Sequence, residues 1–318
     1  MPELPEVEIA ARNLRRWAAG RTITRAEADP GARYVFRPST PEAFAREIAG
    51  ARVVELRRIG KQVLITLERA GAPLGLLVHL GMTGKWLRRA AADDPPRYSR
   101  ARLHLDDGAV LHLVDLRLFG RLRLVPGARF DEIPEVVELG PDPLEHGIDV
   151  DRLVAALARS KLPVKVRIMD QAILPGVGNI VASEACFRAR LDPRRRSSSL
   201  SREEVARLAA AVLDVVNETL AREDGPEIAY VEEGAENPFL VYAREGERCP
   251  RCRRAAIERV VQAQRSTFFC PRCQAPAAKT RPARTGAGRA ARPPAREPRP
   301  TRRPARKAGP VPRRRRVD

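Results

Sequence analysis

The chain has 318 residues, a formal net charge of +19 and five cysteines, and this length is ordinary for two domains. No run of 18 residues is apolar and free of charge, and the N-terminus lacks the basic-then-apolar order of a secretory signal, so we expect neither a membrane span nor secretion. Residues 274–318 hold 15 Lys or Arg against Glu297 and Asp318, a net +13, which leaves +6 for the rest. Because both parts are basic, a nucleic acid is the expected partner, with an anionic membrane surface as the alternative.

The chain should open with a helix over residues 6–17, where apolar residues recur at helical spacing after Pro5. Residues 22–125 then change to short apolar runs typical of antiparallel strands. We expect strands at 53–56, 63–67, 76–80, 102–105 and 111–113, the last two joined by an Asp107-Gly108 turn. After a Pro/Gly-rich stretch at 126–143, the pattern predicts helices over 151–160 and 201–222, the second opened by a capping box of Ser201 and Glu204.

A turn lies between these two helices, at residues 174–179 (Leu-Pro-Gly-Val-Gly-Asn). Its proline and two glycines exclude a continuous helix and leave backbone N–H groups free. Such a turn before a helix predicts a seat for a phosphate. After Cys273 the chain is rich in Arg, Pro and Ala and holds almost no large apolar residue, so residues 276–318 are expected to be disordered.

Four cysteines are arranged as two pairs, Cys249-x2-Cys252 and Cys270-x2-Cys273, separated by 17 residues. Each pair suits one tight turn, and two such turns complete a tetrahedral thiolate shell for zinc. A four-cysteine shell leaves the metal no open position, so we expect one structural Zn²⁺ without a hydrolytic role. The fifth cysteine, Cys186, is expected to be a small buried apolar side chain.

Several basic residues have an ordinary explanation beside a functional one. Arg265, next to the hydroxyls of Ser266 and Thr267, is suited to grip a phosphate, although arginines are common on surfaces. Lys61, which follows Gly60 at a predicted hairpin, is by its position alone typical of a solvated residue. The same holds for two further lysines, Lys161 and Lys165.

Two bulky apolar residues, Met82 and Phe119, each lie beside a glycine at the end of a strand. Core packing is the ordinary interpretation of both. Wedges that fill the gap left by a base extruded from a DNA duplex would need the same kind of side chain.

The N-terminus allows a covalent chemistry. Removal of the initiator methionine before Pro2 would leave a free secondary amine, and an α-amine has a pKa of about 8, so a fraction is an unprotonated nucleophile at neutral pH. Attack of this amine on a sugar aldehyde carbon gives an iminium that can drive elimination of a phosphate, while Glu3 could supply the proton that opens the ring. Taken alone, Pro2 and Glu3 are more typical of a helix start.

Six motifs together closely resemble the bacterial formamidopyrimidine-DNA glycosylase family: MPELPEVE at 1–8, RRIGK at 57–61, HLGMTG at 79–84, DLRLFG at 115–120, PGVGNIVASE at 175–184 and QRSTFFCPRC at 264–273. The resemblance covers residues 1 to about 275. It implies an α+β fold, with an N-terminal two-layer antiparallel β-sandwich flanked by helices, then a helix-two-turn-helix domain with a zinc ribbon. We therefore expect a sandwich domain at 1–126, a linker at 127–143, a DNA-binding domain at 144–240, the ribbon at 241–275 and a basic tail at 276–318.

The resemblance also implies residue roles for a bifunctional glycosylase and AP lyase that removes oxidised or ring-opened purines, such as 8-oxoguanine, by β,δ-elimination. Pro2 corresponds to the Schiff-base nucleophile, Glu3 to the acid, and Lys61 to the group that serves proton transfer and the strand phosphate. Arg265 corresponds to the ribbon arginine that holds the lesion's phosphate. The remaining DNA-contacting positions that match the family are Met82, Arg117 and Phe119, which fill the void and read the opposite base, and Lys161, Lys165 and Asn179, which contact the backbone.

Three departures from the family concern DNA contacts. Gln62 replaces a usual aromatic residue and Leu118 a common basic one, and both are expected to alter rate or opposite-base preference. Arg100 replaces a histidine that contacts DNA and is expected to keep binding phosphate. The cysteine spacing is one residue longer than expected, and residues 225–240 look short where the family has a loop that covers the flipped base.

Two other functions compete with this interpretation: an endonuclease VIII-like glycosylase for oxidised pyrimidines, and a non-catalytic zinc-ribbon DNA-binding protein. Leu4-Pro5, Arg117 and Phe119 favour the purine branch. The expected partner is damaged double-stranded DNA, bound by a monomer in the bacterial cytoplasm, at the nucleoid, without a membrane. The tail is expected to tether the enzyme to DNA, with a solubilising extension as the alternative.

Overall fold

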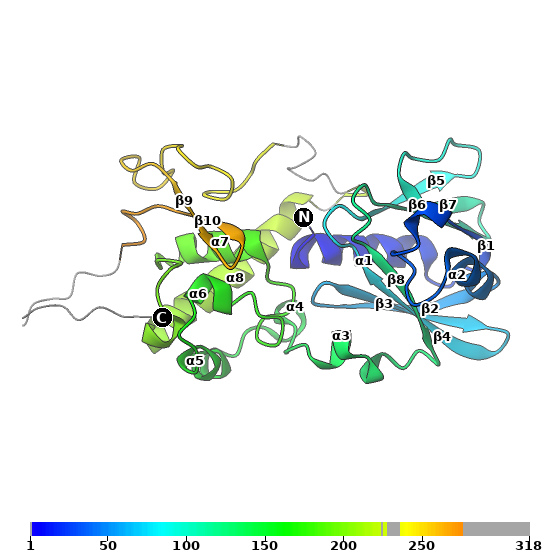
Figure 1. Cartoon of the computed structure of the whole chain (residues 1–318), viewed down its shortest axis with the longest axis horizontal. Helices are drawn as coiled ribbons and strands as arrows, with labels where there is room; N and C mark the ends of the chain where they lie inside the picture. Colours follow the sequence, from blue (N-terminus) through cyan, green and yellow to red (C-terminus); the bar gives the residue numbers. More distant parts are fainter. Residues whose placement is uncertain (1, 224, 228–235, 276–318) are drawn as a thin grey trace, which may run out of the picture. The chain divides into compact units, whose positions relative to one another are not determined.

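The computed structural model describes residues 2–223, 225–227 and 236–275, and Figure 1 shows the order of their helices and strands. Two predictions therefore lie outside the described residues: the disorder expected of 276–318, and half of the stretch at 225–240 that was expected to cover a flipped base, namely residues 228–235. The helices are α1 (Leu4–Ala18), α2 (Pro41–Ile48), α3 (Pro134–Val137), α4 (Pro143–His146), α5 (Val150–Ala158), α6 (Val164–Arg167), α7 (Asn179–Arg188) and α8 (Arg202–Glu223). The strands are β1 (Ile23–Ala28), β2 (Arg52–Ile59), β3 (Gln62–Arg69), β4 (Ala72–His79), β5 (Lys85–Ala90), β6 (Ser99–Leu105), β7 (Ala109–Val114), β8 (Arg121–Pro126), β9 (Glu258–Gln262) and β10 (Arg265–Phe269).

Eight strands form two four-stranded antiparallel sheets, in the orders β1-β6-β7-β5 and β2-β3-β4-β8 (Figure 1). Their facing sides share one apolar core, in which Ile65 and Leu76 of one sheet join Trp86 and Leu103 of the other. Strand β6 buries alternate side chains, because successive residues point to opposite faces of a sheet, whereas β7 is buried along its whole length. This arrangement confirms the predicted two-layer sandwich, and every predicted strand is present, with extensions of up to four residues at an end.

Helix α2 interrupts the region that the sequence assigned to strands. Thr40 caps it by accepting a hydrogen bond from Ala43 N, and Pro41 occupies the first turn, where a proline loses no hydrogen bond. These two residues are a helix-start signal that the sequence analysis did not use.

The C-terminal half is helical, and α8 is its central element, in contact with α1, α5 and α7. The predicted capping box at its start is confirmed, because Ser201 N donates to Glu204 Oε2 and Glu204 N donates to Ser201 Oγ. Helix α7 also contacts β10, so the β9–β10 hairpin packs on this helical layer. Among the described residues, no helix is both long and apolar enough to cross a bilayer.

Candidate functional site

Glu3 is anchored at the N-terminus of α7, although it precedes that helix by more than 170 residues. Its carboxylate accepts hydrogen bonds from Gly178 N (3.1 Å), Ile180 N (2.8 Å) and Val181 N (3.0 Å), and only 1% of the residue is exposed. The positive end of the helix dipole stabilises this negative charge. The prediction that these N–H groups bind a phosphate is therefore wrong, because the Glu3 carboxylate already accepts their hydrogen bonds.

The start of α1 packs so closely against the 174–179 turn that the turn has no room for a side chain at either of its two glycines. Leu4 N donates to Gly176 O at 3.0 Å. A Cβ on Gly176 would lie 2.6 Å from Leu4 Cβ, and one on Gly178 would lie 2.3 Å from the carboxyl carbon of Glu3. Both glycines are needed because the backbone approaches another part of the chain.

Lys61 reaches the same turn from the other side. It follows Gly60 in the β2–β3 hairpin, and its Nζ donates to Val177 O at 3.4 Å. Burial lowers the pKa of Lys61 below that of an ordinary lysine; the Glu3 and Glu6 carboxylates oppose this shift, and the charge of Arg265 adds to it. The structure thus brings Glu3, Lys61 and Arg265 close enough for their charges to interact, and a lysine with a lowered pKa gives up its proton more readily than an ordinary lysine.

Two further titratable groups surround this cluster, and the sequence did not single them out. Burial, together with the neighbouring Glu3 charge, raises the pKa of Glu6 to about 7, and Glu6 Oε2 accepts a hydrogen bond from Glu3 N at 2.8 Å. Burial, together with the charges of Lys61 and Arg121, lowers the pKa of His79 to about 4. The only sequence signal for Glu6 is its place in the first turn of α1, which is normal for a solvated glutamate.

Arg265 begins β10, directly after a tight turn in which Ala263 and Gln264 have positive φ angles of 47° and 60°. Its side chain is exposed. An exposed guanidinium whose charge reaches the half-buried Lys61 is free to meet a phosphate of a bound strand.

Lys165 of α6 and Asn179 of α7 form hydrogen bonds that connect these helices to strand β10 of the ribbon. Lys165 Nζ donates to Asn179 Oδ1 and to Ser266 O (3.4 Å), and Asn179 Nδ2 donates to the same carbonyl at 3.0 Å. Lys165 is fully buried and Asn179 is 5% exposed. Both side chains are thus engaged within the protein, and the contacts with the DNA backbone predicted for them stay predictions. Lys161 is exposed.

The β4–β5 turn and the loop before β8 are joined by the fully buried Asp115. Its carboxylate accepts hydrogen bonds from Thr83 Oγ1 (2.6 Å), Arg117 N (3.2 Å) and Gly120 N (2.8 Å). A Cβ on Gly81 would lie 2.4 Å from the carbonyl carbon of Phe119, so the two segments are in direct contact. Met82 is thereby placed beside the loop.

The tip of this loop exposes apolar side chains. Phe119 is 47% exposed and Leu116 is 54% exposed, and the Arg117 guanidinium lies 5.0 Å from the Phe119 ring centroid. The core interpretation of Phe119 is therefore wrong. Leu118 has a φ of 58° and is half-buried against the core, so it does not extend with its neighbours.

Two residues that depart from the family, Arg100 and Gln62, differ in whether their side chains are hydrogen-bonded. Arg100 donates to Asp29 Oδ2 and to Asp115 O, both at 2.8 Å. These bonds fix the orientation of the guanidinium, and the phosphate contact expected of Arg100 stays a prediction. Gln62 lies opposite His79 in the β3–β4 register, and its buried Oε1 has no partner among the described residues.

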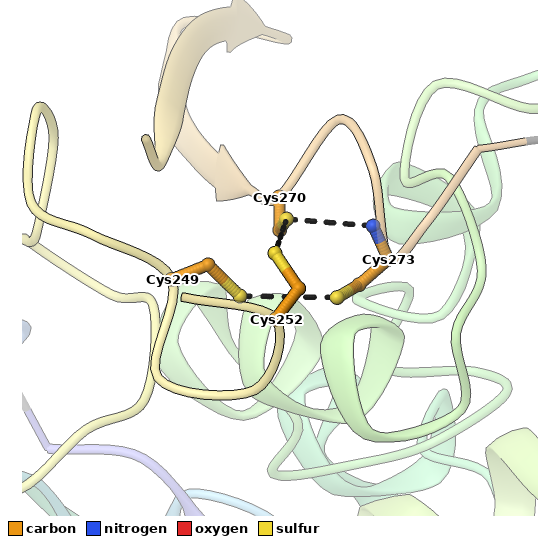
Figure 2. Close-up of side chains that lie close together, drawn as sticks. All are labelled: Cys249, Cys252, Cys270 and Cys273. Atoms are coloured by element: carbon orange, nitrogen blue, oxygen red, sulfur yellow. Dashed lines mark hydrogen bonds between the residues drawn. The ribbon is translucent and has the colours of Figure 1, made fainter. Parts of the chain in front are cut away.

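The four cysteine sulfurs converge, as Figure 2 shows. Cys249 Sγ lies 3.8 Å from Cys273 Sγ, and Cys252 Sγ lies 3.8 Å from Cys270 Sγ. All four lie within 4.8 Å of one another. A tetrahedron with Zn–S bonds of about 2.3 Å has S–S edges of roughly 3.8 Å, so these residues fit one structural zinc ion, as predicted. Cys186 is fully buried, also as predicted.

Comparisons with known proteins match nearly all of the described chain. The family profile "Formamidopyrimidine-DNA glycosylase N-terminal domain" matches residues 1–122, "Formamidopyrimidine-DNA glycosylase H2TH domain" matches 139–228, and "Zinc finger found in FPG and IleRS" matches 246–276. The proteins named Formamidopyrimidine-DNA glycosylase from Paracoccus denitrificans and Rhodospirillum centenum are 40% and 39% identical to it, over 86% of this chain and all of theirs.

Solved structures of proteins from the same family resemble this fold. The MutM (Fpg) protein of Thermus thermophilus superposes with a TM-score of 0.72 at 37% identity, over 86% of this chain and 98% of that one. The Lactococcus lactis Fpg bound to DNA containing N7-benzyl-Fapy-dG superposes with a TM-score of 0.75 at 25% identity, over 86% of this chain and 100% of that one.

Proposed function

Since the chain belongs to the formamidopyrimidine-DNA glycosylase family, and is therefore a DNA glycosylase of base excision repair with the AP lyase activity of that family, we propose that Pro2 is its nucleophile. Met1 must be removed to free the amine. Pro2 is buried directly before Glu3, at the start of α1. The observation that carries the proposal is the anchored Glu3 carboxylate, which has Lys61 and Arg265 around it.

In the first step, the Pro2 nitrogen forms a bond to C1′ of the damaged nucleoside, and the bond from C1′ to the base breaks. The base leaves with the electron pair and takes a proton from water. Glu3 then transfers the proton of the new ammonium to O4′, the C1′–O4′ bond breaks, and an iminium joins Pro2 to C1′. The three N–H groups that hold Glu3 keep its carboxyl in one place for this transfer.

The iminium then drives strand cleavage. It acidifies C2′, and loss of the C2′ proton breaks the C3′–O3′ bond, so that the phosphate leaves as an anion. We assign the removal of this proton to Lys61 in its neutral form, which its lowered pKa makes more abundant. Arg265 holds the departing phosphate and supports the second elimination, in which loss of the C4′ proton breaks the C5′–O5′ bond.

The exposed tip at Arg117 and Phe119, together with Met82, fills the gap left by the extruded base and faces the opposite strand. Lys161 contacts the DNA backbone. Lys165 and Asn179 act by positioning other elements, because their polar groups are engaged within the protein, and Arg100 contacts a DNA phosphate.

We further propose oxidised or ring-opened purines as substrates, and a monomer that works in the cytoplasm. The names of the relatives and the Fapy-dG complex of the Lactococcus lactis protein support the purine branch. The proposed division is a sandwich domain (1–126), a linker (127–143), a DNA-binding domain (144–240), a ribbon (241–275) and a basic tail (276–318); the three profile matches support its order.

Borohydride trapping tests this function. The enzyme is incubated with a duplex that carries 8-oxoguanine opposite cytosine, and a covalent protein–DNA adduct is expected. Pro2→Gly should abolish the adduct, whereas Pro5→Gly, which changes a proline in the first turn of α1 without touching the amine, should keep it. Trapping only on an oxidised-pyrimidine duplex would favour the endonuclease VIII-like function, and binding without an adduct on either duplex would favour the non-catalytic one.

A further inference from the structure

A buried ion pair lies directly behind the hairpin that carries Lys61. Arg58 Nη1 and Nη2 donate to the two carboxylate oxygens of Asp142, at 2.5 and 2.8 Å. The side chains are 4% and 0% exposed. A two-bond contact between a planar guanidinium and a carboxylate fixes orientation as well as distance.

This pair joins three parts of the chain. Arg58 lies on β2, and its Nε donates to Glu8 Oε2 on α1 at 2.7 Å. Asp142 precedes α4 and caps it by accepting from Leu144 N (3.0 Å) and Glu145 N (3.3 Å). Helix α1, the β2–β3 hairpin and the start of α4 are thus connected through one buried cluster.

The same carboxylate holds the backbone next to Lys61. Gly60 N donates to Asp142 Oδ2 at 2.6 Å, and Gly60 O accepts from Arg58 Nη1 at 3.2 Å. Both backbone polar groups of Gly60 are therefore bound to the ion pair, so the peptide planes on either side of this residue are held. Gly60 has a φ of 55°, and its Cα side is so close to the 174–179 turn that a Cβ would lie 3.0 Å from Pro175 Cβ.

The direction of the Lys61 side chain depends on this backbone. A lysine has four rotatable bonds, but its Cα position and peptide plane set the volume that Nζ can reach. The hairpin packs against Pro175 and is held by Asp142. In this position Lys61 Nζ donates to Val177 O and lies close enough to Glu3 for their charges to interact. A shift of about 1 Å at the reacting group can cost up to a hundredfold in rate.

We propose that Arg58 and Asp142 are positioning residues that hold the Gly60-Lys61 backbone in the geometry required for strand cleavage. The proposal rests on the proposed role of Lys61. Neither residue touches DNA, since both side chains are buried; they act through the hairpin alone.

Asp142→Asn tests this role, because asparagine keeps the size and one acceptor oxygen but removes the charge and places an NH2 group against Arg58 or Gly60. The matched control is Asp149→Asn. Asp149 caps α5 in the same way, by accepting from Asp151 N (2.9 Å) and Arg152 N (3.1 Å), but it is exposed and has no bond to the hairpin. Arg58→Lys is the second variant, since it keeps the charge and loses the two-bond geometry.

Two single-turnover rates are measured for each full-length variant: cleavage of a duplex with a preformed abasic site, and borohydride trapping at that site. We expect Asp142→Asn to slow cleavage by about 10- to 100-fold while trapping stays within about twofold of wild type. Arg58→Lys should lie between wild type and Asp142→Asn, and Asp149→Asn should match wild type in both rates.

The decisive measurement is the double variant with Lys61→Ala. If Asp142 acts through Lys61, Asp142→Asn should slow cleavage in wild type but add nothing once Lys61 is gone. Equal losses for Asp142→Asn and Asp149→Asn, equal losses in cleavage and trapping, or full additivity with Lys61→Ala would each overturn the proposal. Cleavage that Lys61→Ala leaves unchanged would instead refute the proposed role of Lys61, and the positioning role with it.

Discussion

Gly178→Ala should disable base excision although glycine 178 carries no side chain. The added Cβ would lie 2.3 Å from Glu3 Cδ and 2.4 Å from Glu3 Oε1, more than 1 Å closer than ordinary contact. Glu3 must then leave its seat, and with 1% of its surface exposed it has no solvent-filled space to enter. The backbone of Gly178 itself has no positive φ (−127°), so the effect comes from the contact and not from backbone strain.

The magnitude follows from the bonds that break. Hydrogen bonds to a charged group contribute about 1.5–3 kcal/mol each, and displacement of the carboxylate weakens three of them. We expect a loss of about 3 kcal/mol in the free energy of unfolding, since part of the contact can relax. Excision should fall by about a hundredfold or more, because the acid has moved by about 1 Å.

The assays are chemical denaturation and single-turnover release of 8-oxoguanine. Gly31→Ala is the matched control, because Gly31 N also donates to a carboxylate, that of Asp29 at 2.8 Å. An added Cβ would lie 3.2 Å from this carboxylate, which is 28% exposed and therefore has room to shift by a few tenths of an ångström. A Gly178→Ala enzyme with wild-type stability and excision would refute the reasoning. Equal losses in the two variants would refute it as well.

Three further outcomes are expected. The pKa of Glu6 is raised from 4.5 to about 7 in the folded protein, so the protonated form of Glu6 favours folding. This contribution to the free energy of unfolding, about 3 kcal/mol, is complete below about pH 4.5 and is lost as the pH rises to about 7. Glu6→Gln should therefore flatten that part of the plot of unfolding free energy against pH. Arg265→Ala removes a cation that lowers the pKa of Lys61, so the rise of β-elimination rate with pH should move to higher pH; a shift to lower pH would contradict this. Removal of residues after 276 takes away most of a net charge of +13. DNA affinity should then fall less steeply with salt concentration, while lesion cleavage persists. An unchanged slope of log affinity against log salt concentration would exclude a tethering tail.

The features that the sequence predicted best are those whose partners lie close together in the chain. The two Cys-x2-Cys pairs and the capping box at Ser201 depend on spacings of a few residues, and the structure confirms both. The strands were also predictable, because a short apolar run bounded by turn residues is a local pattern.

Long-range pairing was beyond such patterns. Arg58 and Asp142 are 84 positions apart, and nothing near either residue indicates that they meet. Lys165 resembled a DNA contact by motif position, but the carbonyl that it binds belongs to Ser266, 101 positions away. Whether a basic residue faces DNA or the interior is decided by packing, and packing joins segments that the sequence keeps apart.

The anion-binding N–H groups at the start of α7 are another case in which long-range packing decides what the sequence left open. A helix N-terminus attracts any anion, and the turn alone could not distinguish a phosphate from a carboxylate. The bond from Leu4 N to Gly176 O fixes the start of α1 beside the turn, so Glu3 is always present there, whereas a DNA phosphate would have to displace it. In the proposed mechanism, the start of α7 therefore orients the acid, and we assign phosphate recognition to the cations around it, Lys61 and the exposed Arg265.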